Sequence, residues 1–485
     1  MSAPTNTNPA RGMRDFLPIE VRKREYVIEI IKEVYESYGF EPLETPAVEN
    51  LETLTGKYGE EGNQLIYKIL KRGEKLEQSA SEKDLSDLAL RYDLTVPLAR
   101  VVANHKNDLP RFFKRYQIQP VWRADRPARG RFREFYQCDV DAIGSSSMIV
   151  EAELCAAVSE ILHKLKFKGF VIQLNHRKIL SAMLNSVNVP KERHVEALIT
   201  LDKFDKIGDE AVFNEAMKLN LSENFLKLAP FFRSILNKRR EINQEFADRT
   251  MEHKRNVAFN KYNEDVLEII SSFIKGQEGE QGLSDIKKIL EFVRINNLEG
   301  RVIISPMLAR GLSYYTGAIM EINLDADSEF EDFNVSIGGG GRYDGLIGMF
   351  GKEEIPACGF SLGLERILVV MEERGMFPKE LETNSADVLI TVWNEESIGE
   401  SLKLAGELRQ QKLRVLVYPE ADKLGKQFKY AAQINVPFVC ILGESELAEN
   451  KVTLKNMETG EQETIEREEA AARVKIHKQN SKSKS

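Results

Sequence analysis

The chain has 485 residues and a formal net charge of −8, with 42% hydrophobic and 30% charged residues. This length predicts two to four domains, and we expect three. The acidic balance argues against non-specific coating of nucleic acid, although it allows a partner that binds a local basic patch. No run approaches the roughly 20 apolar residues that cross a bilayer, and the first ten residues lack the apolar core of a secretory signal. We therefore expect a cytoplasmic protein without a membrane partner.

The first predicted element is an amphipathic helix over residues 21–38, where apolar side chains recur at three- and four-residue spacing before Gly39. The next segment contains Pro42 and Pro46, which permit a strand only at a sheet edge or an interface. Such an exposed edge would favour association with a second subunit.

Residues 111–133 carry eight Lys or Arg residues against one acid, Asp125. Two apolar-interleaved runs flank a basic turn with Pro and Gly, which predicts a hairpin with cations at its tip. At period two, one face of the second run carries Arg133, Phe135, Gln137, Asp139 and Asp141. A polar face alone is typical of an ordinary strand facing water. Because Arg123, Arg131 and Arg133 converge on one turn, however, the pattern favours a bound anion such as a nucleotide phosphate.

A helical, Lys- and Glu-rich pattern covers residues 195–297 and indicates an insertion, after which strands resume over 301–304 and 318–322. The run Gly338–Gly341 fits neither common nucleotide-binding glycine pattern. A tight turn or bulge is the usual reason for such a run, but Arg342 follows it directly, so a ligand cradle is an equal alternative. The four cysteines stand singly in apolar stretches and are predicted to be reduced core residues. They are Cys138, Cys155, Cys358 and Cys440.

Residues 357–371 open as a glycine-punctuated strand and then become helical, which places Arg366 near a helix start. A cation there opposes the helix dipole unless it reaches a bound anion, although an exposed helical arginine is the commoner explanation. After a polar linker at 379–385, three apolar runs at 387–392, 414–418 and 438–442 are separated by helical lengths. This spacing predicts a small α/β domain.

Three of these segments, in this order, resemble the signature motifs of class II aminoacyl-tRNA synthetases. They are Pro46–Val48, the hairpin from Trp122–Asp125 to Arg131–Phe135, and Gly359–Arg366. Three further segments resemble the histidyl-tRNA synthetases in particular: Arg11–Pro18, Leu90–Thr95 and Leu308–Gly317. The resemblance extends from about Arg11 to Lys475. One departure is Ser313, where the family usually has Asp, and this puts the local hydrogen bonding in doubt more than the activity.

The resemblance implies an α/β fold: a class II catalytic core built on an antiparallel sheet, with a helical insertion, and a small C-terminal mixed α/β anticodon-binding domain. The corresponding boundaries follow the composition shifts along the chain. They are a disordered N-terminus at 1–10, the core at 11–194 and 298–378, the insertion at 195–297, the linker at 379–385, the anticodon-binding domain at 386–475 and a disordered basic tail at 476–485.

The implied activity is that of an aminoacyl-tRNA ligase. It activates L-histidine with ATP to histidyl-adenylate and pyrophosphate, and then transfers histidine to the 3′ end of tRNA(His). The resemblance assigns catalysis to Arg123 and Arg310. It implies a homodimer, and Mg²⁺ bound through the ATP phosphates without any metal ligand assigned to the protein. The expected ATP-binding residues are Arg123, Asp125, Arg131, Arg133, Phe135 and Arg366. The expected histidine-binding residues are Asp93, Thr95, Gln137, Asp141, Arg310, Tyr314 and Tyr315.

Two alternatives stay open at this point. Relatives of this fold serve as catalytically inactive regulatory subunits or as sensors of uncharged tRNA, and these should have eroded active sites. A sister synthetase for another small amino acid is the other alternative, which the segment Arg310–Tyr315 and the lack of a Cys/His zinc set disfavour. At the place of Asp141 a family member can carry Glu, and the shorter Asp side chain would need the backbone or a water to come closer.

Overall fold

The computed structural model describes residues 6–77, 85–201, 203–245, 252–296, 298, 301–309, 314–324, 336–351, 353–382 and 386–482. Contacts divide the chain into two compact units, 1–376 and 377–485, where we expected three domains. The reason is that α12 (Gln277–Ile295) contacts α6 (Ile149–Lys164) and the sheet directly, so the insertion belongs to the first unit. Among the helices of the described ranges, none is long and apolar enough to cross a membrane.

The first unit is built on an eight-stranded sheet in the order β1-β5-β6-β11-β10-β9-β7-β8. Its central pairs are antiparallel, whereas the pairs β1–β5 and β7–β8 at the two edges are parallel. The strands are, in chain order, β1 Glu41–Pro42, β5 Phe113–Trp122, β6 Glu134–Ile143, β7 Phe170–His176, β8 Val302–Ile304, β9 Ala318–Leu324, β10 Ser336–Arg342 and β11 Ala357–Gly363. The predicted hairpin over 111–141 is therefore confirmed as β5 and β6, and Pro42 lies at the sheet edge as expected.

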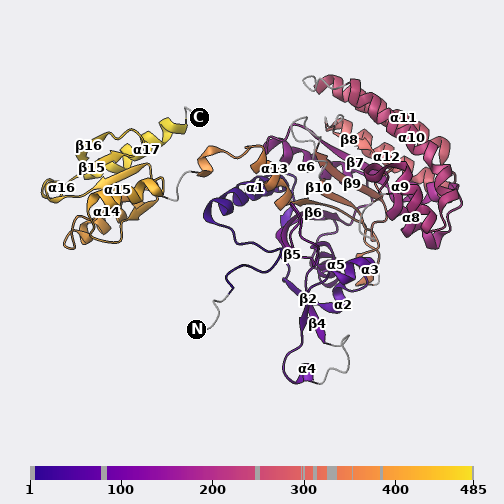
Figure 1. The fold of residues 1–485 in the computed structure, drawn as a ribbon, viewed down its shortest axis with the longest axis horizontal. Helices are drawn as coiled ribbons and strands as arrows, with labels where there is room; N and C mark the ends of the chain where they lie inside the picture. The colour runs from indigo at the N-terminus through magenta and orange to yellow at the C-terminus, as the bar shows by residue number, and fades with distance from the viewer. Residues whose placement is uncertain are drawn as a thin grey trace. The chain divides into compact units, whose positions relative to one another are not determined.

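Helices cover one face of this sheet, as Figure 1 shows for α1, α6 and α13. The first is α1 (Pro18–Ser37), which begins with a proline at its first position and is followed by Gly39 at φ +76°. Its buried side chains, including Val27, Ile31 and Val34, occur at the spacing that the sequence predicted. On this face the strands present apolar residues such as Val140 and Phe360, so the core lies between the helices and the sheet.

The remaining elements of the first unit surround this frame. The chain segment between α1 and β5 forms a second, three-stranded sheet in the order β2-β4-β3. Its elements and their neighbours are β2 Val48–Asn50, α2 Leu51–Leu54, α3 Gly59–Gln64, β3 Lys68–Leu70, α4 Glu74–Glu77, β4 Ser86–Leu90 and α5 Thr95–Asn104. Before the insertion lies α7 Arg177–Ser186. The insertion and the residues next to it form α8 His194–Leu201, α9 Phe204–Lys218, α10 Ser222–Glu245 and α11 Glu252–Phe273 ahead of α12. The last helix of the first unit is α13 Leu364–Glu373.

The second unit has its own five-stranded sheet in the order β13-β12-β14-β15-β16. The three predicted apolar runs form its parallel part, β12 Val388–Ile390, β13 Val415–Val417 and β14 Phe438–Ile441. The other elements are α14 Ile398–Gln410, α15 Leu424–Gln433, α16 Glu444–Glu449, β15 Lys451–Asn456, β16 Gln462–Glu466 and α17 Ala470–Lys482.

The prediction of disorder at the two chain ends falls partly outside the described residues. Residues 1–5 and 483–485 lie outside the described residues. The tail that we predicted to be disordered from residue 476 instead continues α17 as far as Lys482. Lysine and glutamine are good helix formers, so the polar composition that suggested disorder is also compatible with an extended helix. The four cysteines are free and buried, as predicted.

Candidate active site

The face of the large sheet opposite the helices is lined with polar side chains. They form rows across the sheet, because residues that pair on neighbouring strands point to the same side. The first row of pairs joins Arg115, Asp141, Gly359 and Gly341. The second row joins Gln117, Asp139, Ser361 and Gly339. The third row joins Gln119, Gln137 and Gly363. The predicted polar face of β6 is thus the centre of a wider polar floor.

Glycines in this floor make room for the polar side chains. A Cβ on Gly359 would lie 1.9 Å from Asp141 Oδ1, and a Cβ on Gly341 would lie 3.1 Å from the Tyr315 ring. The run Gly338–Gly341 therefore forms no tight turn. It lies within the interior strand β10, where the only irregularity of the described pairing with β9 is a register shift between Ser336 and Gly338.

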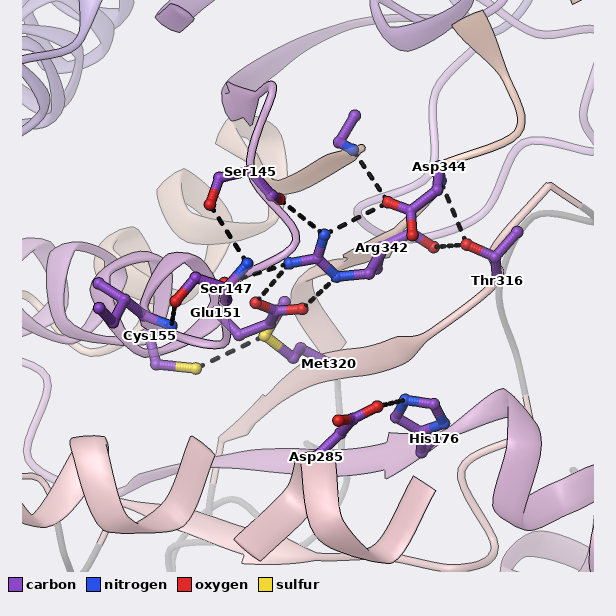
Figure 2. A network of polar contacts seen from close by, with 12 residues as sticks. Ser145, Ser147, Glu151, Cys155, His176, Asp285, Thr316, Met320, Arg342 and Asp344 are labelled. Carbon is purple, nitrogen blue, oxygen red and sulfur yellow. Dashed lines mark hydrogen bonds and ion pairs between the residues drawn. The ribbon is translucent and has the colours of Figure 1, made fainter. Parts of the chain in front are cut away.

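Arg342, which had raised the expectation of a ligand cradle, faces the helix-covered side of the sheet. Its Nε and Nη2 donate to the two carboxylate oxygens of Glu151 on α6, at 2.7 and 2.8 Å. Nη1 donates to the Ser145 carbonyl and to Asp344 (Figure 2). Since Glu151 and Arg342 are both buried, this pair fixes α6 to the sheet, and that expectation for Arg342 was wrong.

Arg123 is held at the edge of the polar floor by its own surroundings. Its Nε donates to the carbonyl oxygen of Tyr92 at 3.0 Å. The guanidinium carbon lies 4.3 Å from the centre of the Tyr92 ring and 5.2 Å from that of Phe135. Within the described ranges no hydrogen bond or ion pair engages its two terminal nitrogens. The side chain is therefore oriented by two rings and a carbonyl, with a fork of donors left for an anion.

Asp93 lies just before α5 and is 1% exposed. Its Oδ1 accepts hydrogen bonds from the Tyr58 hydroxyl at 2.9 Å and from the Val96 amide at 3.0 Å, and its Oδ2 accepts one from Tyr314 at 3.2 Å. Burial raises the pKa of Asp93, while these three donors and the charge of Arg123 act in the opposite direction. Thr95 hydrogen-bonds to Tyr314, which connects the two segments that the sequence had assigned to histidine binding.

Asp141 is the acid at the centre of the first row. The Arg115 Nη2 lies 2.8 Å from its Oδ2, and the Tyr343 hydroxyl donates to its Oδ1 at 2.5 Å. Both Arg115 and Asp141 are essentially inaccessible to solvent. Burial raises the pKa of Asp141, and Arg115 and Tyr343 act against that shift. Asp141 is thus held by an ion pair at Oδ2 and a hydrogen bond at Oδ1. Its Oδ2 has no hydrogen-bond partner within the described residues, which leaves an acceptor for a substrate.

The arginines in and beside the loop between β5 and β6 have different bonding partners. Arg366 at the start of α13 packs beside this loop, where a Cβ on Gly130 would lie 3.5 Å from its Cγ, and it donates to the Ser336 carbonyl. Arg131 instead forms an ion pair with Asp125 at 3.0 Å. Arg133 donates through Nε to the Asp125 carbonyl at 3.0 Å, and its amide donates to the Gly12 carbonyl.

These contacts divide the predicted ATP-binding residues into two groups. Arg123 lies against the Phe135 ring, and Arg366 lies beside Gly130 of the loop, so these three keep positions from which they could contact a ligand. The other three, Asp125, Arg131 and Arg133, connect the loop to itself and to the N-terminal segment, so in this structure they support the loop. Arg310 and Ser313 lie outside the described residues.

Four residues of this site were not among the expected ligands: Tyr58, Arg115, Asp139 and Tyr343. The alternation had already placed Asp139 on the polar face of β6, and pairing the two strands of the hairpin in register would have added Arg115 beside Asp141. Tyr58 and Tyr343 come from segments with no distinguishing pattern, so no local signal indicated them.

Comparison with known proteins now identifies the family. Residues 12–367 match the family model of histidyl-tRNA synthetase, and residues 387–477 match that of the anticodon binding domain. Histidine--tRNA ligases of Porphyromonas gingivalis and Christiangramia forsetii are 41% and 38% identical, in each case over 94% of this chain and 96% of the relative. The crystal structure of histidyl-tRNA synthetase from Nostoc sp. PCC 7120 superimposes with a TM-score of 0.74 at 31% identity, covering 98% of this chain and all of that one. The chain belongs to the histidyl-tRNA synthetase family.

Proposed function

We propose that this chain is a histidine--tRNA ligase. Its first reaction joins the carboxylate of L-histidine to the α-phosphorus of ATP and releases pyrophosphate. Its second reaction transfers the histidyl group to the 3′ end of tRNA(His). The observation that supports this most strongly is Arg123, which is held by the Tyr92 carbonyl with its donor fork open and whose charge acts on the buried acid Asp93.

In the first reaction, negative charge accumulates on the phosphorus that is attacked, and a preorganised cation stabilises it. Arg123 would serve this purpose, with Arg310 approaching from the side of the amino acid. Phe135 offers a ring for the adenine, and Arg366 offers a cation next to the same loop. Mg²⁺ enters with the ATP phosphates as part of the substrate. The part of the chain that the structure describes contains no group of three or more metal-binding side chains.

The polar floor would select the amino acid. The imidazole ring of neutral histidine has one donor and one acceptor, which calls for a fixed carboxylate and a hydroxyl. Asp141, oriented by Arg115 and Tyr343, and the neighbouring Tyr315 supply these groups. An amino acid without the ring nitrogens would leave buried polar atoms unpaired, which penalises its binding strongly.

The same reasoning disfavours an inactive regulatory or tRNA-sensing protein, which would be expected to lose its site. Asp93, Arg123 and Asp141 are all present, and each is held by a hydrogen bond to another residue of the first unit. The domain matched at 387–477 would bind the anticodon of the tRNA. We further propose a cytoplasmic homodimer, which the proline-containing strand β1 at the open edge of the sheet supports.

ATP–pyrophosphate exchange, measured with each of the twenty amino acids in turn, tests this function. We expect exchange with histidine alone, and severe loss of exchange in Arg310→Ala. Exchange with a different amino acid would overturn the proposed substrate. No exchange with any amino acid would instead favour the inactive alternative.

A further inference from the structure

We propose that Arg91 is a positioning residue for ATP activation, whose guanidinium fixes the segment Arg91–Asp93 against β5 and so orients Arg123. This inference rests on the proposed function, because it specifies what keeps the proposed phosphate-binding arginine in place. Arg91 has no contact with a substrate in this arrangement. It acts through the carbonyl oxygen of Tyr92, which accepts a hydrogen bond from Arg123 Nε at 3.0 Å.

The backbone of Arg91 lies at the open edge of β5. Among the described strands on that side, β1 pairs with β5 only at Arg115 and Tyr116. Further along this edge, the Trp122 amide donates to the Arg91 carbonyl at 3.1 Å. The Arg91 amide donates to the Ala47 carbonyl at 2.9 Å. The main chain of Arg91 thus joins the end of β5 to the segment between β1 and β2.

The side chain of Arg91 extends this attachment. Its Nε donates to the Pro120 carbonyl at 2.8 Å, and its Nη1 donates to the Thr45 carbonyl at 2.6 Å and to Gln119 Oε1 at 2.8 Å. Arg91 is 2% exposed, and these three acceptors are neutral. Burying a guanidinium against neutral acceptors costs free energy. What it provides here is a rigid fork of donors that binds two carbonyls and one amide at once.

The same hydrogen bonds connect Arg91 to the polar floor. Gln119 Oε1 also accepts from Gln117 Nε2 at 2.6 Å, and Gln117 Oε1 accepts from Arg115 at 3.1 Å. Arg115 in turn lies 2.8 Å from Asp141. Since Gln119, Gln117 and Arg115 alternate along one face of β5, a line of hydrogen bonds runs along this strand. Arg91 is one end of a buried network, in which the loss of one donor leaves its acceptors unsatisfied.

The consequence for Arg123 follows from the chain connection. Tyr92 is the next residue after Arg91; its ring centre lies 4.3 Å from the Arg123 guanidinium carbon, and its carbonyl accepts from Nε. Both contacts depend on where the Arg91 segment is held. A misplacement of about 1 Å at a group that positions reacting atoms can cost about 10²-fold in rate. The main-chain bonds of Arg91 remain after substitution, so we expect the segment to fold while Arg123 loses its fixed orientation.

Arg91→Met tests the proposal, because methionine is a flexible apolar side chain that fills irregular gaps and donates no hydrogen bond. With the full-length protein, we expect kcat for histidine-dependent ATP–pyrophosphate exchange to fall by about 10- to 100-fold. Arg91→Lys keeps the charge without the planar fork and should recover part of the lost rate. A kcat for Arg91→Met within about twofold of the unaltered protein would overturn the proposal.

Repeating the substitution in Arg123→Ala separates positioning from a merely structural role. If Arg91 acts through Arg123, Arg91→Met should lower kcat by less than about twofold in that background, because the group it orients is already absent. A structural role would instead lower kcat by the same factor in both backgrounds. That result would also overturn the proposal.

Arg100→Met is the matched control. Arg100 lies on α5, and its Nε and Nη2 donate to the two carboxylate oxygens of Glu49 at 2.9 and 2.7 Å. Its removal leaves the buried Glu49 without this partner and so lowers stability. Because Arg100 forms no part of the line of bonds along β5, kcat should stay close to that of the unaltered protein. An equal fall of kcat in Arg100→Met and Arg91→Met would show that destabilisation alone lowers the rate.

Binding of a non-hydrolysable ATP analogue, titrated calorimetrically, tests the role of Arg91 independently of catalysis. Arg91→Met should weaken this binding by about fivefold in the unaltered background, and much less in Arg123→Ala. Equal weakening in both backgrounds, or none, would contradict the proposal even if the chain exchanged with no amino acid. If the chain exchanges with histidine while Arg91→Met keeps its kcat, only the role of Arg91 fails.

Discussion

Replacing Arg123 with alanine is expected to lower kcat for histidine-dependent ATP–pyrophosphate exchange by about 10²- to 10³-fold, the cost typical of removing one preorganised donor from a developing negative charge. The geometry explains why this arginine should matter so much. Its Nε is bound to the Tyr92 carbonyl, and its plane is fixed by two aromatic rings, so no reorganisation is needed when charge develops. Steady-state kinetics at saturating histidine and ATP measure the effect.

Arg123→Lys and Arg129→Ala are the matched controls. Lysine keeps the positive charge but cannot present a planar fork, so Arg123→Lys should recover only part of the lost rate. Arg129 belongs to the same loop but is exposed and forms an ion pair with Glu373, so Arg129→Ala should leave kcat close to its original value. If Arg123→Ala and Arg129→Ala lowered kcat by the same small factor, kcat would depend on the total charge of the loop and not on Arg123 itself. Our assignment of Arg123 would then be wrong.

Replacing Arg115 with methionine is expected to be the most destabilising single change in the polar floor, at about 3 to 5 kcal/mol of unfolding free energy at pH 8. Arg115 is 0% exposed and lies 2.8 Å from Asp141, and it also donates to Gln117 at 3.1 Å. Its loss leaves two buried carboxyl groups without a cation. Urea-induced unfolding, followed by a signal from the catalytic unit, measures the change.

The loss of unfolding free energy in Arg115→Met should be larger at high pH than at low pH. Burial places the folded-state pKa values of Asp139 and Asp141 above the unfolded value near 4, so these groups lower stability as the pH rises toward the folded pKa. The charge of Arg115 lowers both pKa values, and its removal extends that loss of stability to higher pH. Arg115→Met should therefore cost less at pH 5 than at pH 8. A cost that is the same at both pH values would show that Arg115 contributes by packing alone.

A double variant serves as the control for this interpretation. Adding Asp141→Asn to Arg115→Met removes one of the unpaired charges and should restore part of the stability at pH 8. Because the residues are in direct contact, the two changes should not be additive.

The sequence predicted the catalytic frame well where local periodicity and turn residues agree. Alternation over residues 111–141 located the hairpin β5–β6, and the recurrence of apolar residues before Gly39 located α1. The run Gly338–Gly341 was assigned to a turn, a bulge or a ligand cradle. It forms an interior strand with a register shift at its start, between Ser336 and Gly338. The missing side chain of Gly341 makes room for Tyr315, which depends on tertiary pairing that no local pattern reveals.

In the site, too, the sequence predicted the positions that local alternation sets and did not predict the contacts between distant segments. Residues on the second predicted strand, such as Gln137 and Asp141, could be placed on one face from the alternation alone. The contacts of Asp93 with Tyr58 and Tyr314 join segments 35 and 221 residues apart in the chain, so only the folded structure reveals them. Arg342 was given a possible ligand role because of its neighbours in sequence, whereas its side chain points to the opposite face of the sheet from Gly341 and pairs with Glu151.

We propose that cations from distant segments and the acids of the polar floor form a single site for histidyl-adenylate. A crystal structure with a non-hydrolysable histidyl-adenylate analogue tests this most directly. We predict that the phosphate mimic lies within hydrogen-bond distance of the Arg123 fork, the adenine against Phe135, and the histidyl group over Asp139 and Asp141. An analogue bound elsewhere, with Arg123 and Asp141 facing different cavities, would show that these residues do not form one site.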